Sequence, residues 1–192
     1  MNRSKRINRN RPKRKTRNRI LIVTEGIKTE VTYIQGLVQH LDATGAKVHA
    51  TKTRGIGKDP LYVLREAASI QENDQDGFDS TWVLVDVDDH TTLEDCLSEA
   101  KKSDIKVVIS NPSFEIWLLW HFEDCNKNCN NKYLERRLRD LGHEGKTVTH
   151  KFPFEEYESA IVRANSTGKK VFYNKKGKNP SSAMPFLIEN LK

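Results

Sequence analysis

Carboxylate side chains follow two apolar segments of the sequence that have the character of buried strands. The segment ILIV leads into Glu25, and the segment WVLV leads into Asp86, with Asp88 two residues further on. Side chains alternate along an extended chain, so Asp86 and Asp88 point to one side. Two carboxylates about 4 Å apart repel by roughly 4 kcal/mol at an effective dielectric of about 20, so such a pair needs a cation or a shared proton. Because oxygen ligands favour hard cations, we expect Asp86 and Asp88, at a strand end like that of Glu25, to bind Mg²⁺ or Mn²⁺.

Four further residues extend this hypothesis. Gly26 allows a tight turn or a close approach of the backbone, and Lys28 would form a phosphate site together with the first amides of the next helix. Glu115 falls in the first turn of a predicted helix, where its carboxylate either faces the same crevice or complements the helix dipole. Lys151 is a candidate cation beside the scissile phosphate. A plainer alternative for the Asp-rich turn after Asp86 is that it caps the next helix.

Strand and helix patterns alternate along the chain after residue 19, which predicts an α/β fold. Short apolar runs indicate buried strands, and apolar residues at helical spacing indicate the helices between them. Such crossovers favour a mainly parallel open sheet flanked by helices, with ligands at the carboxyl ends of the strands. The expected strands are residues 20–24, 47–52, 81–86 and 106–110. The expected helices are residues 29–41, one that starts near Asp59 and Pro60, residues 91–103, and one with Asn111 as N-cap and Pro112 at its first position.

The last third of the chain is less regular and predicts an α-helical C-terminal embellishment. We expect helices at residues 133–141, 154–165 and 184–191, and a lysine-rich loop at residues 166–183. The expected organisation is one domain at residues 20–192, with an α/β core at 20–124 and the embellishment at 125–192. Trp117 and Trp120 are expected in the core, because no face of their segment is free of apolar residues.

The positive charge of the chain is concentrated at its beginning. Residues 1–19 hold 10 of the 33 Lys and Arg side chains and no Asp or Glu. The rest of the chain therefore has 23 basic and 26 acidic side chains. Such an arm is expected to be disordered when free, and to bind a nucleic acid backbone by releasing counterions. A solubilising or targeting tail is the alternative. The arm residues expected to contact nucleic acid are Arg3, Arg6, Arg9, Arg11, Lys13, Arg14 and Lys15.

Composition argues against several other classes of protein. No apolar run approaches the roughly 20 residues of a membrane span and no signal peptide opens the chain, so we expect a cytoplasmic protein without a membrane partner. Three cysteines are too few for a disulfide scaffold. His121, Cys125 and Cys129 lack an evident fourth ligand for zinc. The GIKT segment lacks the spacing of a nucleotide-binding P-loop.

The motifs also resemble those of known proteins. The Glu-Gly turn and the Asp-x-Asp pair resemble the Toprim fold of topoisomerases, primases and OLD-type nucleases. More closely, the segments ILIVTEGIKTEVTYI, VDVDDH and SNPSFEIWLLWHFED, with NPSSAM near the end, resemble the RloB-like family of bacterial proteins, which is associated with restriction loci and abortive phage infection. Ile27 departs from the acidic or polar residue expected in relatives. The resemblance covers nearly the whole chain after the basic arm.

The resemblance implies a Toprim-like fold and a nuclease. Glu25 would then act as a general acid or base or as a metal ligand, and Asp86 and Asp88 would hold magnesium. We therefore expect a Mg²⁺- or Mn²⁺-dependent endonuclease, a phosphodiester hydrolase of DNA or RNA in anti-phage defence, with a defence-system protein as a further partner. The alternatives are a non-catalytic module that binds nucleic acid or a partner protein, and a nucleotidyl transferase.

Overall fold

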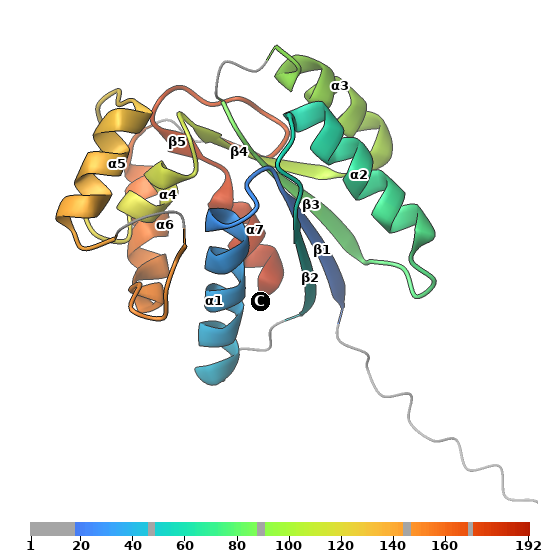
Figure 1. The fold of residues 1–192 in the computed structure, drawn as a ribbon, viewed down its shortest axis with the longest axis horizontal. Helices are drawn as coiled ribbons and strands as arrows, with labels where there is room; N and C mark the ends of the chain where they lie inside the picture. Colours follow the sequence, from blue (N-terminus) through green and yellow to red (C-terminus); the bar gives the residue numbers. More distant parts are fainter. Residues whose placement is uncertain (1–17, 46–48, 88–90, 144–146, 169–170) are drawn as a thin grey trace, which may run out of the picture.

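The computed structural model describes residues 18–45, 49–87, 91–143, 147–168 and 171–192, which form a mixed α/β fold (Figure 1). Within these ranges, five strands form one sheet in the order β2-β1-β3-β4-β5. The strands are β1 (Arg19–Thr24), β2 (Ala50–Gly55), β3 (Ser80–Asp86), β4 (Lys106–Asn111) and β5 (Ser181–Ser182). Strands β1 to β4 are parallel, and β5 pairs with β4 in the antiparallel direction. The prediction of a mainly parallel open sheet flanked by helices is therefore confirmed.

Helices cover both faces of the sheet. Helices α2 and α3 pack on one face, whereas α1 and the C-terminal helices pack on the other (Figure 1). The helices are α1 (Thr29–Ala43), α2 (Pro60–Asn73), α3 (Leu93–Ser103), α4 (Glu115–Leu119), α5 (Asn131–Asp140), α6 (Tyr157–Ser166) and α7 (Met184–Leu191), with a 3-10 turn, η1 (Phe154–Glu156), before α6. None of the helices in the described ranges is long and apolar enough to cross a membrane.

The two covered faces explain the continuous apolar run of β1. Ile20 and Ile22 pack into the cluster that includes α1, while Leu21 and Val23 pack into the cluster with α2 and α3. Neighbouring side chains of a strand point to opposite faces, so a strand buried on both sides needs apolar residues at every position. Burial of β1 on both faces fixes the depth at which it ends and delivers Glu25 to the edge of the sheet.

The structure corrects three predicted boundaries. Asn111 is not a helix N-cap, because it is the last residue of β4, pairs with Ser181 and donates a hydrogen bond from Nδ2 to the Gly177 carbonyl at 2.7 Å. The following helix, α4, begins only at Glu115. Strand β2 ends three residues later than expected, at Gly55.

The third correction concerns the lysine-rich loop, which contains the short strand β5. The segment treated in the sequence as an addition thus extends the sheet at β5, and α7 packs into the same apolar cluster as α1. Asp59 is confirmed as the N-cap of α2, since its side chain accepts a hydrogen bond from the Tyr62 amide.

The predicted basic arm is shorter than expected at its C-terminal end. Arg19 belongs to β1, and its guanidinium forms an ion pair with Asp74 at 2.8 Å. The arm residues expected to bind nucleic acid fall within residues 1–17, which lie outside the described ranges.

A buried polar pair sits in the aromatic part of the core. His121 contacts the Tyr33 hydroxyl through Nε2 at 3.2 Å and the Trp117 carbonyl through Nδ1 at 3.0 Å. The carbonyl requires a donor, so Nδ1 carries the proton and Nε2 accepts from the tyrosine. Burial lowers the pKa of His121 from 6.5 to about 4. Both ring nitrogens are engaged in the core, where Trp117 and Trp120 are also fully buried, as predicted.

The buried His121 predicts a loss of stability in weak acid. The unfolded chain binds a proton at His121 near pH 6.5, whereas the folded chain does so only near pH 4. Stability linked to this group is therefore complete above pH 6.5 and falls as the pH drops towards 4, by up to about 3 kcal/mol. Denaturant unfolding of wild type and His121→Gln across this range should give a flatter pH profile for the variant. His150→Gln, at an exposed turn, should follow the wild type; parallel profiles for all three proteins would contradict the assignment.

Candidate functional site

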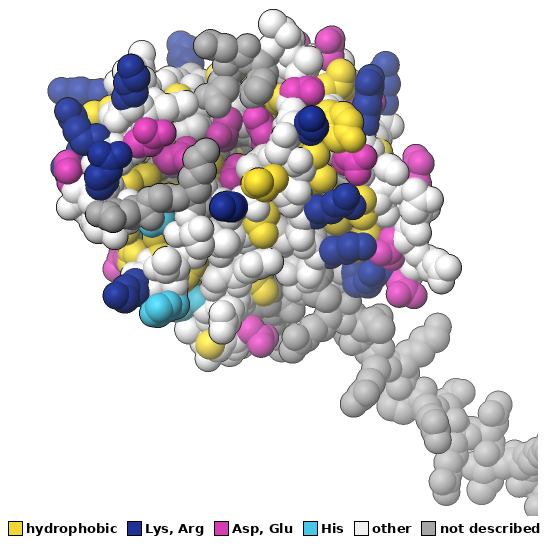
Figure 2. Space-filling view, viewed as in Figure 1, with side chains coloured by type: hydrophobic (Ala, Val, Ile, Leu, Met, Phe, Trp, Pro, Cys, Tyr) yellow, Lys and Arg dark blue, Asp and Glu magenta, His cyan; other side chains and the backbone are white. Residues whose placement is uncertain are grey.

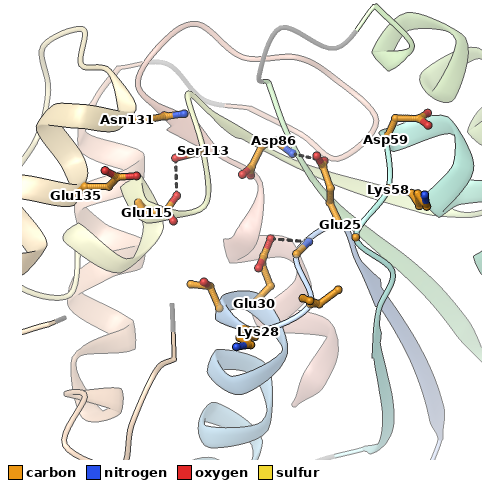
Figure 3. Close-up of a pocket in the computed structure, with 14 residues that line it drawn as sticks. Glu25, Lys28, Glu30, Lys58, Asp59, Asp86, Ser113, Glu115, Asn131 and Glu135 are labelled. Atoms are coloured by element: carbon orange, nitrogen blue, oxygen red, sulfur yellow. Dashed lines mark hydrogen bonds between the residues drawn. The ribbon is translucent and has the colours of Figure 1, made fainter. Parts of the chain in front are cut away.

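A cavity of about 710 Å³ opens at the carboxyl ends of β1 and β3. It lies between the β1–α1 turn, the start of α2, and the segment that joins β4 to α4 and α5 (Figure 3). Its charged lining residues are Glu25, Lys28, Glu30, Lys58, Asp59, Asp86, Glu115 and Glu135. Six of these eight side chains are carboxylates, and Figure 2 shows Asp and Glu side chains gathered in the upper middle of this face. The cavity therefore has an acidic interior with few cations.

Glu25 and Asp86 meet in this cavity, as the sequence led us to expect. β1 and β3 are adjacent parallel strands, so residues that follow or end them reach the same edge of the sheet. The backbone amide of Asp86 donates a hydrogen bond to Oε2 of Glu25 at 3.3 Å. Both side chains are half-buried. Asp88, the third predicted ligand, lies outside the described residues.

Glu30 is a site residue that the sequence analysis missed. It lies in the first turn of α1, is only 6% exposed, and its Oε1 accepts a hydrogen bond from the Gly26 amide at 3.1 Å. Burial raises the pKa of Glu30, and the nearby Glu115 and Glu25 carboxylates raise it further. A glutamate in the first turn of a helix is ordinary, because it complements the helix dipole, so no local pattern marks this one as buried.

Two glycines make room for this arrangement. A Cβ atom added at Gly26 would collide with the carboxylate of Glu30, so the absence of a side chain is what lets that carboxylate reach the Gly26 amide. A Cβ added at Gly55 would lie 2.6 Å from both the Gly26 carbonyl oxygen and the Ile27 Cα. Real Cβ atoms do not approach other heavy atoms so closely, so Gly55 lets the β1–α1 turn lie against the end of β2. The role of Gly26 is thus clearance for a buried carboxylate.

Glu115 reaches the cavity from the opposite side. It begins α4, is half-buried, and accepts a hydrogen bond from the Ser113 hydroxyl at 2.6 Å (Figure 3). Its charge bears on Glu30 strongly enough to raise the pKa of that residue. Of the two interpretations of Glu115, an orientation towards the crevice therefore describes its surroundings better than a helix-dipole contact alone.

The predicted cations are placed differently. Lys28 and Lys58 are exposed at the mouth of the cavity, from the β1–α1 turn and the loop before α2. Lys151 is exposed in a turn before η1 and is not among the residues that line the cavity. Lys28 thus remains a candidate phosphate contact, and Lys58, which the sequence analysis did not single out, joins it.

Metal-binding geometry is not preassembled in the described part of the chain. In residues 18–45, 49–87, 91–143, 147–168 and 171–192, no group of three or more His, Cys, Asp or Glu side chains could hold a metal ion as it stands. Each of the three glutamates is instead held by its own hydrogen bond: Glu25 by the Asp86 amide, Glu30 by the Gly26 amide, and Glu115 by Ser113.

The sequence matches a known protein family over most of its length. The family model described as RloB-like protein matches residues 20–191, which is nearly the whole chain after the basic arm. No curated protein and no solved structure matches the chain.

The raised pKa of Glu30 predicts that this residue costs stability. A carboxyl whose pKa is higher in the folded chain destabilises the fold as the pH rises through that pKa, because its charge is then buried beside other charges. Glu30→Gln should therefore raise the melting temperature at neutral pH by a few degrees, given about 2–4 °C per kcal/mol for a domain of this size. The difference from wild type should shrink in acid, where Glu30 is protonated.

Glu135→Gln is the matched control for this measurement, because Glu135 is an exposed carboxylate at the same cavity. Exposed substitutions usually change stability by no more than about 0.5 kcal/mol. A lower melting temperature for Glu30→Gln would show that the charged carboxylate gains more from the Gly26 amide than it loses by burial.

Proposed function

The chain belongs to the RloB-like protein family, and on that premise we propose that its acidic cavity is the active site of a metal-dependent phosphodiester hydrolase acting on nucleic acid. The observation that carries the proposal is the convergence of Glu25, Glu30, Asp86 and Glu115 in one cavity at the carboxyl ends of parallel strands. Ligand sites in open α/β sheets form at this edge. The Toprim-like relationship implied by the motifs is part of the same proposal.

The donor set fits a hard divalent cation. All four carboxylates offer oxygen atoms, and the burial of Glu30 beside Glu115 and Glu25 is unfavourable until a positive charge or a proton offsets it. Glu25, Glu30, Asp86 and Glu115 would hold Mg²⁺ or Mn²⁺, together with Asp88, the third ligand that the sequence predicts. The bound cation would polarise a phosphoryl oxygen and lower the pKa of a bound water.

Residues of the chain supply orientation, phosphate binding and proton transfer. The amides of Gly26 and Asp86 and the Ser113 hydroxyl orient three carboxylates before any substrate binds. Lys28 and Lys58 at the mouth would bind non-bridging phosphate oxygens as mobile cations.

Proton transfer is assigned to a carboxyl with a raised pKa, since such a group exchanges a proton more readily near neutral pH. Glu30 is such a group, because burial raises the pKa of its carboxyl. In that role Glu30 would transfer the proton instead of coordinating the cation. Glu25, which the motif resemblance favours for this role, is the alternative. A pH–rate profile of Glu30→Gln would separate the two, because a limb of the wild-type profile that is absent from the variant would be assigned to Glu30.

The biological setting is also part of the proposal, and it is argued from the family and not from the cavity. DNA and RNA both present the phosphodiester that the cavity would cleave. Anti-phage defence through abortive infection, with a partner protein of the same defence system, rests on the family alone. Cytoplasmic activity follows from that setting and is proposed with it.

The proposal predicts cleavage that depends on both metal and carboxylates. Purified protein should cleave single-stranded or duplex polynucleotides in Mg²⁺ or Mn²⁺ and stop on addition of a chelator. Glu25→Ala and Asp86→Ala should lower the rate by at least about 10²-fold, since each removes a charge that acts on the developing negative charge of the reaction. Asp88→Ala should do the same on the sequence prediction. Gel assays of end-labelled substrates would measure the rates.

Glu72→Ala is the control, because Glu72 is an exposed carboxylate in the last turn of α2 and lies outside the cavity lining. Equal cleavage by wild type and by Asp86→Ala would identify a contaminating nuclease. Binding that persists in chelator, with no cleavage under any metal, would favour the non-catalytic module. Incorporation of a labelled nucleoside triphosphate would favour a nucleotidyl transferase.

Gly26→Ala tests the clearance at the β1–α1 turn. The added methyl would displace the carboxylate of Glu30 from the Gly26 amide without touching the apolar core. Loss of a contact that orients a metal ligand typically costs about 10–100-fold in activity or metal affinity. The expected result is that loss in the cleavage assay with a melting temperature within a few degrees of wild type. Full activity in Gly26→Ala would mean that the position of Glu30 is unimportant for the reaction.

A further inference from the structure

Helix α5 carries an exposed cationic face beside the acidic cavity. Lys132, Arg136 and Arg139 are all exposed, and their spacing of four and three residues places them within about 60° of one another around the helix axis. Leu134 and Leu138 are buried on the opposite side and anchor the helix to the core. Figure 2 shows Lys and Arg side chains over this helix, at the left of the acidic region. We call Lys132, Arg136 and Arg139 the α5 cationic face.

No carboxylate in the described ranges neutralises this face, although the Arg136 guanidinium lies over the Tyr133 ring, 5.8 Å from its centroid. Arg137, on another side of the helix, forms ion pairs with Glu123 and Asp140 and is part of the scaffold. By contrast, none of the three face residues forms an ion pair with a carboxylate in the part of the chain that the structure describes. A row of unpaired cations costs self-repulsion, so an anionic partner would relieve it.

The face adjoins the cavity at several points. Asn131 and Glu135 of the same helix line the acidic cavity itself. Arg139 lines a smaller cavity of about 210 Å³ that shares Thr29, Glu115 and Glu135 with the acidic one. At the other end of the helix, Lys132 lines a polar depression that begins at Val87, immediately after Asp86. A chain that leaves the acidic cavity over α5 therefore meets these cations first.

We propose that the α5 cationic face binds the sugar-phosphate backbone of a polynucleotide strand that continues from the cavity. This inference rests on the proposed function and narrows its substrate class to polynucleotides that extend beyond the cleaved bond. From Lys132 to Arg139 the helix rises about 10 Å, which matches the axial rise of about three nucleotide steps at roughly 3.4 Å each. Two of the three cations are arginines, whose planar guanidinium groups pair with phosphate oxygens in a bidentate manner.

The position of the face favours nucleic acid over an acidic protein. Lys28 and Lys58 flank the same cavity on its other side, so the carboxylates lie between two groups of cations. A backbone with a charge at every residue would contact both groups while one phosphodiester sits at the carboxylates. An acidic protein partner would place its own carboxylates against the six that line the cavity.

Binding without turnover tests the face directly. The full chain, in chelator, is titrated with a fluorescent 30-nucleotide single strand and with the matching duplex at several salt concentrations. Log K falls as log salt rises, and each lost phosphate contact makes this slope less steep, by about 0.7 for single strands and about 0.9 for duplex. The variant Lys132→Gln/Arg136→Gln/Arg139→Gln should therefore have a slope that is less steep than that of the wild type by about 2–3. Lys101→Gln/Lys102→Gln/Lys176→Gln, three exposed lysines outside α5 and outside the lining of the acidic cavity, matches the change in net charge and should keep the wild-type slope.

Turnover of a small substrate separates this inference from the proposed function. With Mn²⁺, the α5 triple variant should hydrolyse bis(p-nitrophenyl) phosphate at the wild-type rate, because that diester is too small to extend from the carboxylates to the α5 cationic face. Its KM for a polynucleotide should rise at least 10-fold. The single variant Arg136→Glu should also raise KM. Because it changes one exposed residue, it tests the face even if the triple variant folds poorly.

The possible failures are distinguishable. If wild type hydrolyses neither substrate in any metal, the proposed function fails, and the salt slopes alone decide the α5 inference. If the triple variant keeps the wild-type slope and KM, the α5 inference is overturned while the nuclease stands. If those values are unchanged but the variant loses capture of a purified acidic protein, the face serves a protein partner, and the inference is likewise wrong.

Discussion

The structure depends on one unfavourable interaction, the burial of the Glu30 carboxylate beside Glu25 and Glu115. Parallel strands end at the same edge of the sheet, so the chain brings these acidic side chains together whether or not a counter-charge is present. Burial removes the water that would screen their repulsion. The surrounding features follow from this constraint: Gly26 leaves space for the carboxylate, Gly55 lets the turn approach β2, and a nearby hydrogen-bond donor contacts each glutamate.

The cost of this arrangement is offset by the apolar layers on the two faces of the sheet. β1 is buried on both sides, and the layer beyond α1 contains two fully buried tryptophans and the Tyr33–His121 pair. Natural proteins often place their strained or repulsive groups where function needs them and stabilise the remainder of the fold. The contribution of β5 and α7 to this packing means that the C-terminal segment supports the cavity indirectly. Helix α5 belongs to the same layer through Leu134 and Leu138 while its outer side stays charged.

Sequence patterns predicted the fold where local rules decide it. Continuous apolar runs identified β1, β3 and β4, because a strand buried on both faces has apolar residues at successive positions. The Asp59-Pro60 pair identified the start of α2, because helix capping depends on adjacent residues. Asn111-Pro112 carried the same capping pattern and was misread, since pairing of Asn111 with Ser181 across 70 residues overrides the local preference. The two serines of β5 have no strand pattern of their own.

The candidate site was predictable in its strand-end residues and not in its helical ones. Glu25 and Asp86 follow apolar runs, whereas the burial of Glu30 arises from three segments that meet only in the folded chain. Its dependence on Gly26 also makes the two positions thermodynamically coupled. A methyl group at position 26 clashes with residue 30 while that residue is a glutamate, so the effects of changes at the two sites should not add. During evolution, a protein with a shorter residue at position 30 could accept a side chain at position 26. That side chain would then occupy the space of the carboxylate, so a glutamate at position 30 could no longer be restored by a single substitution.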